Sequence, residues 1–137
     1  MDNPSVGFCE IEHTADWELH IWAPDLTSLL EQAARGMYAL SQMRLAAGPR
    51  LTRRFEIPFT DRESLLVDFL SELLFFGEDE EIAFDEYQLD FDGTSLKVRV
   101  GGAPIEEQSK EIKAVTYHKM EVRETGRGLE VNIVFDV

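Results

Sequence analysis

Three polar residues near the start of the chain have types and spacing suited to chemistry: His13, Thr14 and Asp16. Imidazole is an acid–base group near neutral pH, and a carboxylate is a ligand for hard cations. Apolar residues alternate from position 19 to 23, which predicts a half-buried strand immediately after the cluster. Two interpretations are open. The cluster is either a functional loop held by strands, or a turn in which Asp16 and Thr14 bond to nearby backbone amides.

Other catalytic patterns are missing from the sequence. No serine lies in a nucleophile-elbow motif, and there is no Walker-type phosphate loop. His13, His20 and His118 are too dispersed to form a recognisable metal motif. Cys9 is the only cysteine, and we expect it to be a small buried residue. The residues by themselves therefore give no positive case for an active site.

The chain is strongly acidic, with 27 Asp and Glu against 13 Lys and Arg and a formal net charge of −14. Nucleic-acid binding is usually driven by Lys and Arg that displace counterions from phosphates. The longest basic run is Arg53-Arg54, so we expect no strong direct RNA binding. A basic protein partner or divalent cations would suit this field better. The acidic run at 78–81 lacks the ligand spacing of a calcium loop and predicts a solvated turn.

The size and composition predict one globular domain, residues 1–137. Of these residues, 44% are hydrophobic and 29% are charged, which is typical of globular proteins. No apolar run is long enough for a membrane span, and the first residues lack the pattern of a signal peptide. A single cysteine excludes an internal disulfide. We therefore expect a cytoplasmic protein without a membrane association.

Two amphipathic helices organise the predicted fold. The first begins near Leu26, where Thr27 or Ser28 is the expected cap, and Gly36 inside it allows close packing. The second covers about 61–76, with Thr60 and Glu63 as a capping box and Gly77 as its C-terminal stop. Strands are predicted at 8–11, 17–22, 51–59, 87–91, 94–100, 112–123 and 129–136, with a hairpin turn at Asp92-Gly93 and a polar loop at 103–111. The last two strands are predicted to form a hairpin that turns at 125–128.

These elements predict an α+β domain with two helices packed on a largely antiparallel sheet. Pro58 predicts that the strand before it ends there or lies at a sheet edge. A weak repeat of strands, helix and strand is visible in the two halves, which suggests an internal duplication.

Several motifs follow one another along the chain. His13-Thr14-Ala15-Asp16 is followed by an amphipathic helix, and a Leu and Phe pattern covers 65–74. The segment 113–117, Lys-Ala-Val-Thr-Tyr, and the final Asp136-Val137 complete the series. These motifs, in this order and over nearly the whole chain, resemble the archease family, whose members assist the RtcB-type RNA ligase. Trp17 departs from the family, where a small aliphatic residue is commoner.

The resemblance implies a site and a function. Asp16, Asp136 and Val137 would bind a divalent metal, typically Ca²⁺, with Mg²⁺ or Mn²⁺ as alternatives. Val137 would contribute backbone or terminal carboxylate oxygens. Lys113 would contact the partner or a phosphate, or else be an ordinary strand lysine, and His13 would fix the loop that carries Asp16. The implied function is a non-enzymatic activator that promotes guanylylation of the ligase histidine and repeated turnover in tRNA splicing or RNA repair. The alternatives are a stand-alone metal-dependent hydrolase and a general chaperone or adaptor for RNA-modification proteins.

Overall fold

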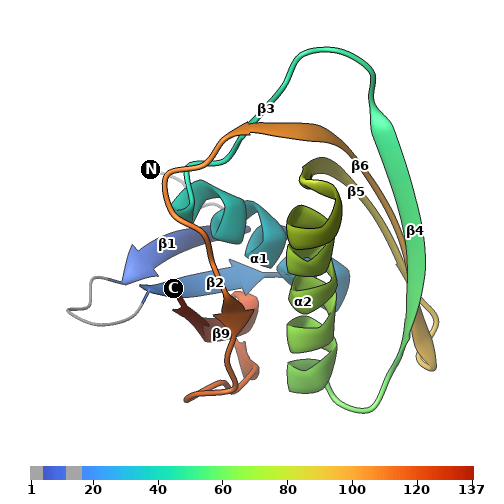
Figure 1. The fold of residues 1–137 in the computed structure, drawn as a ribbon. Coiled ribbons are helices and arrows are strands. Elements are labelled where there is room, and N and C mark those ends of the chain that lie inside the picture. The colour runs from blue at the N-terminus through green and yellow to red at the C-terminus, as the bar shows by residue number, and fades with distance from the viewer. Residues whose placement is uncertain (1–4, 12–16) are drawn as a thin grey trace.

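The computed structural model describes residues 5–11 and 17–137, in which two helices lie between two antiparallel sheets (Figure 1). Among these residues, no helix is long and apolar enough to cross a membrane. The described elements, in chain order, are β1 (Gly7–Ile11), β2 (Trp17–Ala23), α1 (Leu26–Leu40), β3 (Arg44–Leu45), β4 (Leu51–Pro58), α2 (Arg62–Glu80), β5 (Ile82–Phe91), β6 (Ser95–Glu107), β7 (Ala114–Val115), β8 (Arg123–Thr125) and β9 (Gly128–Asp136).

The first sheet is built around β9. Its strand order is β1-β2-β9-β7, and β8 also pairs with β9. Strand β2 pairs along one side of β9, from Trp17 opposite Phe135 to Ala23 opposite Leu129. Strands β7 and β8 pair with the two ends of its other side. The last strand of the chain therefore lies inside the first sheet, with β2 on one side and β7 and β8 on the other.

The second sheet is built around β6. Strand β4 and strand β5 both pair with residues 96–102 of β6, so they lie on its opposite sides, and β3 pairs with its last residues. The β5–β6 hairpin turns at Asp92-Gly93, as predicted, with Gly93 at a φ of 92°. The Asp92 carboxylate accepts hydrogen bonds from the backbone amides of Thr94 and Ser95, at 2.8 and 2.9 Å. Pairing only with β6 makes β4 an edge strand, as Pro58 predicted.

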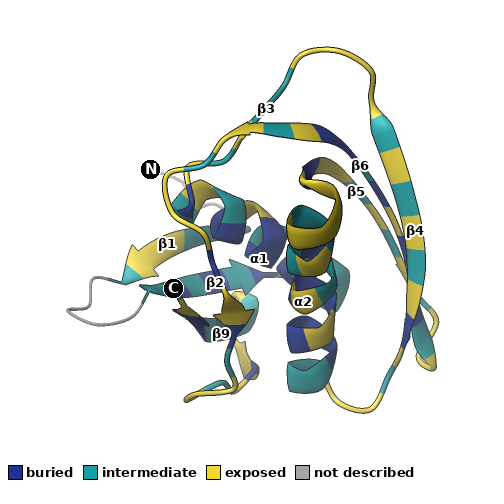
Figure 2. Cartoon of the chain, in the orientation of Figure 1, coloured by how far each residue is buried: buried dark blue, intermediate teal, exposed yellow. Residues whose placement is uncertain are grey.

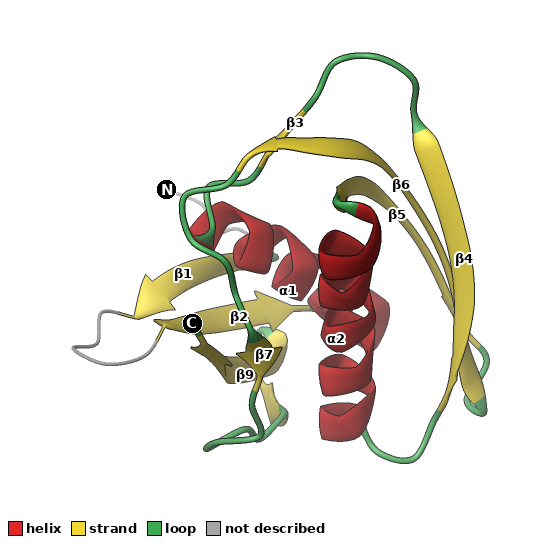
Figure 3. Ribbon diagram, in the orientation of Figure 1, coloured by secondary structure: helices red, strands yellow, loops and turns green. Residues whose placement is uncertain are grey.

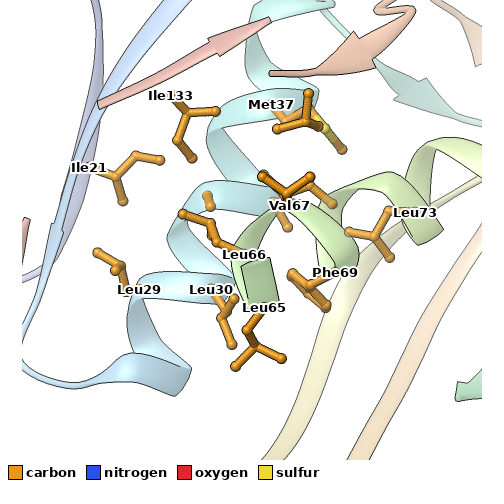
Figure 4. Close-up of a cluster of buried hydrophobic side chains, with 14 of the residues drawn as sticks. Ile21, Leu29, Leu30, Met37, Leu65, Leu66, Val67, Phe69, Leu73 and Ile133 are labelled. Carbon is orange, nitrogen blue, oxygen red and sulfur yellow. The ribbon is translucent and has the colours of Figure 1, made fainter. Parts of the chain in front are cut away.

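The helices fill the space between the sheets (Figures 1 and 3). Helix α1 packs on β1 and β2, and α2 packs on β4 and β5, while the two helices also contact each other. Figure 4 shows the apolar side chains that meet there, including Leu30, Phe69 and Ile133, each fully buried. The fold is α+β with two helices on antiparallel sheets, as the apolar periodicities predicted.

Gly36 allows the predicted close approach of α1 to the first sheet. A Cβ atom at Gly36 would lie 2.8 Å from Cδ1 of Leu19 and 3.0 Å from Cγ of Phe8. Both distances are shorter than a normal carbon–carbon contact, so a larger residue would push the helix outward. The helix-weakening glycine is thus placed where the side chains of Leu19 and Phe8 lie against the helix backbone.

The predicted helix caps were wrong in detail. Asp25 caps α1 by accepting from the Ser28 amide at 2.9 Å, and Asp61 caps α2 by accepting from the Ser64 amide at 2.7 Å. Gly77 does not end α2, which continues to Glu80, and Glu81 is the C-cap in the left-handed region at a φ of 55°. The run at 78–81 is consequently the last helical turn and its cap, and not a separate solvated turn.

The strands of the second half also differ from prediction. Strand β5 begins at Ile82 and β6 continues to Glu107, so most of the predicted loop at 103–111 is strand. The predicted strand at 112–123 is instead two short strands, β7 and β8, with irregular backbone between them. Both halves contain strands, a helix and strands. However, β2 and β3 lie in different sheets, whereas β4 and β5 flank the same strand.

Candidate functional site

The end of β9 brings together the predicted site residues that the structure describes. Asp136 pairs with Ala114, and its carbonyl oxygen accepts a hydrogen bond of 2.8 Å from the Lys113 amide. The side chains of Lys113 and Asp136 are both exposed. An exposed carboxylate and a basic residue, separated by 23 positions in the sequence, are thus backbone neighbours at one end of the first sheet.

Val137 gives this end of the chain a fixed position. Phe135 is fully buried, and Val137 continues the same alternation and packs against the edge of the core. The intervening Asp136 side chain points outward and is exposed. Packing of the Val137 side chain therefore limits the positions open to the backbone oxygens of the last residue.

The segment that carries Lys113 is held at several points. The Ser109 amide and hydroxyl both donate to the carbonyl oxygen of Ser41, at 2.9 and 3.1 Å. Thr116 donates to the carbonyl oxygen of Val134 through its amide at 3.0 Å and its hydroxyl at 2.9 Å. The backbone around Lys113 is therefore anchored to α1 on one side and to β9 on the other.

His13 and Asp16 lie outside the described residues, so the structure does not test their predicted roles. The described residues next to them do bear on the site. Ile11 pairs with Glu18, and Trp17 pairs with Phe135, the residue before Asp136. Figure 1 shows the C-terminus beside the start of β2. The first described residue after the predicted motif thus lies one pair away from Asp136.

The described donors fit part of a hard-cation site. The exposed carboxylate of Asp136 makes no ion pair with a described residue, so its two oxygens are open to a ligand. Residues 5–11 and 17–137 contain no group of three or more His, Cys, Asp or Glu side chains that could hold a metal. Oxygen donors of this kind suit Ca²⁺, but a full coordination shell requires further ligands.

A hydrogen-bonded chain of side chains on the outer face of the first sheet was not predicted from the sequence. Nδ1 of His20 lies 2.6 Å from Oδ1 of Asn132, and Nε2 of His20 lies 2.9 Å from a carboxylate oxygen of Glu130. Asn132 also donates to Glu18 at 2.7 Å. The histidines looked dispersed because β2 and β9 are far apart in sequence. The sequence feature that could have indicated this polar chain is the alternation that places Glu130, Asn132 and Asp136 on one face of the last strand.

This polar chain changes the electrostatics of the face. The pKa of Glu130 is lowered, first by a hydrogen bond from the Thr125 hydroxyl at 2.5 Å and then by the contact with His20. Next to it, the Arg127 guanidinium lies 4.6 Å from the centre of the Trp22 ring, which is cation–π geometry. Cys9 pairs with His20 across β1 and β2 and is exposed, so the expectation of a buried thiol was wrong.

The comparisons with known proteins agree with this fold over the whole chain. The model of the Archease protein family matches residues 8–137. Protein archease of Methanothermobacter thermautotrophicus is 30% identical over 138 residues, covering 96% of this chain and 99% of its own. Protein archease of Danio rerio is 33% identical over 135 residues, covering 93% of this chain and 83% of its own.

A crystal structure of an archease from Thermotoga maritima, described as a possible chaperone, superposes with a TM-score of 0.71 at 25% identity, covering 100% of this chain and 98% of its own. A solution structure of a Methanobacterium thermoautotrophicum protein gives a TM-score of 0.69 at 30% identity, covering 96% of this chain and 99% of its own. The matched family model, the curated relatives and the solved structures all cover nearly the same residues. This chain therefore belongs to the archease family.

Proposed function

We propose that this protein is a non-enzymatic activator of an RtcB-type RNA ligase and acts in the cytoplasm. Its working surface would be an acidic tip, which we define as Asp16, Asp136 and the carboxylate of Val137, with a bound divalent cation, Ca²⁺ before Mg²⁺ or Mn²⁺. Family membership and a net charge of −14 support a role in which cations and a protein partner, and not bare RNA, meet this surface.

The observation that carries the proposal is the meeting of Lys113 and Asp136 at the end of β9. Their backbone bond of 2.8 Å holds a positive and a negative side chain at one end of the first sheet. The neighbouring pair of Trp17 and Phe135 brings the chain that follows Asp16 to the same end of the sheet. Two segments that are far apart in sequence thereby supply complementary charges to one surface.

Each residue has a distinct proposed task. Asp136, Asp16 and the backbone or terminal carboxylate oxygens of Val137 would hold the cation. The packed side chain of Val137 would also fix the position of those oxygens. The bound cation would supply a positive centre that draws phosphate oxygens toward the tip. Lys113 would contact the partner or a phosphate beside that centre, and His13 would hold the loop of Asp16. Guanylylation of the ligase histidine would remain the chemistry of the ligase.

The direct test is the turnover of the RNA ligase with GTP and a divalent metal, with and without this protein. The wild-type chain should raise the number of ligation cycles per ligase, whereas Asp136→Asn and Lys113→Ala should lose most of that effect. Asp68→Asn, which neutralises an exposed carboxylate on α2, is the matched control and should retain it. Equal turnover with and without the wild-type protein would end the proposal.

Metal binding is tested separately by calorimetric titration of Ca²⁺ into the protein without ligase. A short extension after Val137 removes the terminal carboxylate but leaves Asp136 in place, so it should weaken Ca²⁺ binding. Asp16→Asn should weaken it as well. Undiminished affinity in both variants would remove the acidic tip as the cation site, whatever the ligase assay shows.

The two other functions make different demands on the surface. A hydrolase needs a general base near the metal, and two ligating aspartates with a chain end leave none in the acidic tip. A general chaperone needs a broad apolar surface for many clients. Phe75 and Tyr117 are the only large hydrophobic residues that are exposed in the described part of the chain. Both observations favour one specific partner.

A further inference from the structure

The outer face of the second sheet carries an arrangement of charge that the proposed ligase role does not use. Along β4, residues alternate between the helix-facing side and the solvent, as the exposed bands in Figure 2 show. The strand register places the outward residues in rows across the three strands. One row joins Arg54, Arg99 and Gln88, and the next joins Glu56, Lys97 and Asp90.

The two rows differ in whether their positive charges have carboxylates beside them. Lys97 lies between Glu56 and Asp90, so its positive charge is offset from both sides. Arg99 lies between Arg54 and Gln88, so two guanidinium groups stand directly opposite each other without a carboxylate in their row. Like charges directly opposite on a sheet destabilise it. The pair is unexpected in a chain with twice as many acidic as basic residues.

These two arginines also differ from other described arginines in their partners. Arg50 pairs with Asp85 and Glu86, and Arg53 pairs with Glu80. Neither Arg54 nor Arg99 forms an ion pair or a hydrogen bond with any described residue, although both are exposed on the same sheet. Their donors are therefore open to a ligand from solution.

Two shallow, open depressions adjoin the pair. A hollow of about 510 Å³ is bordered by the arginine row and the Lys97 row. A second hollow of about 230 Å³ lies on the far side of Arg99, over Gly101, which has no side chain to fill it. Glu86 leans toward Gly101 but is held by Arg50 at 3.0 Å, so it does not neutralise the pair directly.

We propose that the row of Arg54, Arg99 and Gln88 binds the phosphate of a sugar phosphate on the outer face of the second sheet. Guanidinium groups bind phosphate in a fork geometry, and a phosphate has enough oxygens for two of them, whereas a carboxylate has two oxygens in all. The flanking Glu56 and Asp90 repel a second phosphate but accept hydrogen bonds from hydroxyl groups. The arginine row and the Lys97 row lie about 6.6 Å apart along the strands. A five-carbon sugar can span this distance from a phosphate bound at the arginine row.

The test is an amide NMR titration of the full chain at constant ionic strength with ribose 5-phosphate, inorganic phosphate and ribose. Ribose 5-phosphate should shift the amides of β4, β5 and β6 around the two rows and bind more tightly than inorganic phosphate, and ribose should produce no shift. Equal binding of ribose 5-phosphate and phosphate would overturn the assignment to a sugar phosphate. An absence of shifts with both would overturn the site.

Arg54→Gln and Arg99→Gln should each weaken ribose 5-phosphate binding by about tenfold or more, the loss expected for a charge-assisted hydrogen bond. Arg53→Gln makes the same change of charge on the same strand, but at an arginine already paired with Glu80, and should leave the affinity within about twofold. Equal weakening in all three variants would reduce the effect to net charge and refute the site.

Unfolding measurements give a second readout that does not depend on a ligand assay. Without phosphate, Arg54→Gln should raise the urea midpoint because it removes the like-charge pair. With ribose 5-phosphate present, the wild type should gain stability by mass action and the variant should not. A midpoint that falls in Arg54→Gln without ligand would show that the pair stabilises the sheet and would contradict the proposal.

Discussion

Replacing Gly102 by alanine tests how tightly β5 and β6 approach each other. A Cβ atom at Gly102 would overlap the carbonyl oxygen of Ala83 and lie 2.8 Å from both the Ala83 carbonyl carbon and the Phe84 Cα atom. Carbon atoms normally meet at about 3.5–4.0 Å, so β5 would have to move by roughly 0.7 Å or more. The obstructing atoms are backbone, so no side-chain rotation relieves the overlap.

The cost of this substitution follows from where β5 would move. Ala83 and Phe84 are buried, with 1% and 2% of their surface exposed, and the strand register shifts between Phe84 and Glu86. Overpacking in such a place costs about 1–3 kcal/mol or more. Alanine recovers about 0.4–1 kcal/mol by restricting the unfolded chain. We therefore expect Gly102→Ala to lower the free energy of unfolding by about 1–2 kcal/mol.

Urea unfolding followed by circular dichroism measures this loss. Gly126→Ala is the matched control, because a Cβ atom there would meet nothing within 4 Å. Its free energy of unfolding should stay within about 0.5 kcal/mol of the wild type. If Gly102→Ala unfolds at the same urea concentration as the wild type with the same slope, the close strand approach does not exist.

Three further changes follow from the core and the caps. Phe69→Ala removes a fully buried ring and should cost about 3–5 kcal/mol in urea unfolding, whereas a loss below about 1 kcal/mol would mean that the site collapses freely. Asp25→Ala removes the cap of α1 and should cost about 1 kcal/mol, and Asp25→Ser should recover most of it because serine caps equally well. Asp92 has a pKa lowered to about 2, first by the Thr94 hydroxyl and then by backbone amides, so its native form binds a proton less tightly than the unfolded chain. The stabilising contribution of the ionised Asp92 is therefore complete above pH 3.8 and is lost as the pH falls toward 2. In Asp92→Ala, the free energy of unfolding should fall less steeply with pH on the acid side than in the wild type. An equally steep fall in both proteins would contradict this prediction.

Periodicity in the sequence predicted which segments form the elements, but not every boundary. The apolar stripes of both helices and the alternation in β2 and β9 follow from burial on one face, which is a local signal. The end of α2 is not local. Glu81 adopts a left-handed backbone at a φ of 55°, and its carbonyl oxygen accepts from the Ile105 amide at 2.8 Å. A contact 24 positions away thus outweighs the usual preference for glycine at such a position.

The capping residues illustrate a second limit. Aspartate, serine and threonine are all good caps, so a segment such as Asp25, Thr27 and Ser28 offers several starting points with similar free energies. The structure uses Asp25, which places its carboxylate on the Ser28 amide. The choice depends on how β2 delivers the chain into α1, and this path is fixed by the sheet and not by the residues near the cap.

The candidate site was predictable from the sequence in part. The resemblance indicated Lys113, Asp136 and Val137, and the predicted last hairpin placed the segment of Lys113 beside Asp136, as the pairing of β7 with β9 confirms. The hydrogen-bonded chain of His20 and Asn132 could not be foreseen, because the two residues are separated by 112 positions. Pairing between strands so distant in sequence is set by the whole fold.

The interior position of β9 also bears on how the protein is made. A ribosome delivers β1 and β2 first, yet the strand that covers the free edge of β2 is the last one described. Strands β4, β5 and β6 are all delivered before it and already form a paired unit. Between the synthesis of β2 and that of β9, the nascent polypeptide therefore carries a strand edge with unpaired backbone groups, which exposes it to aggregation unless another protein shields it.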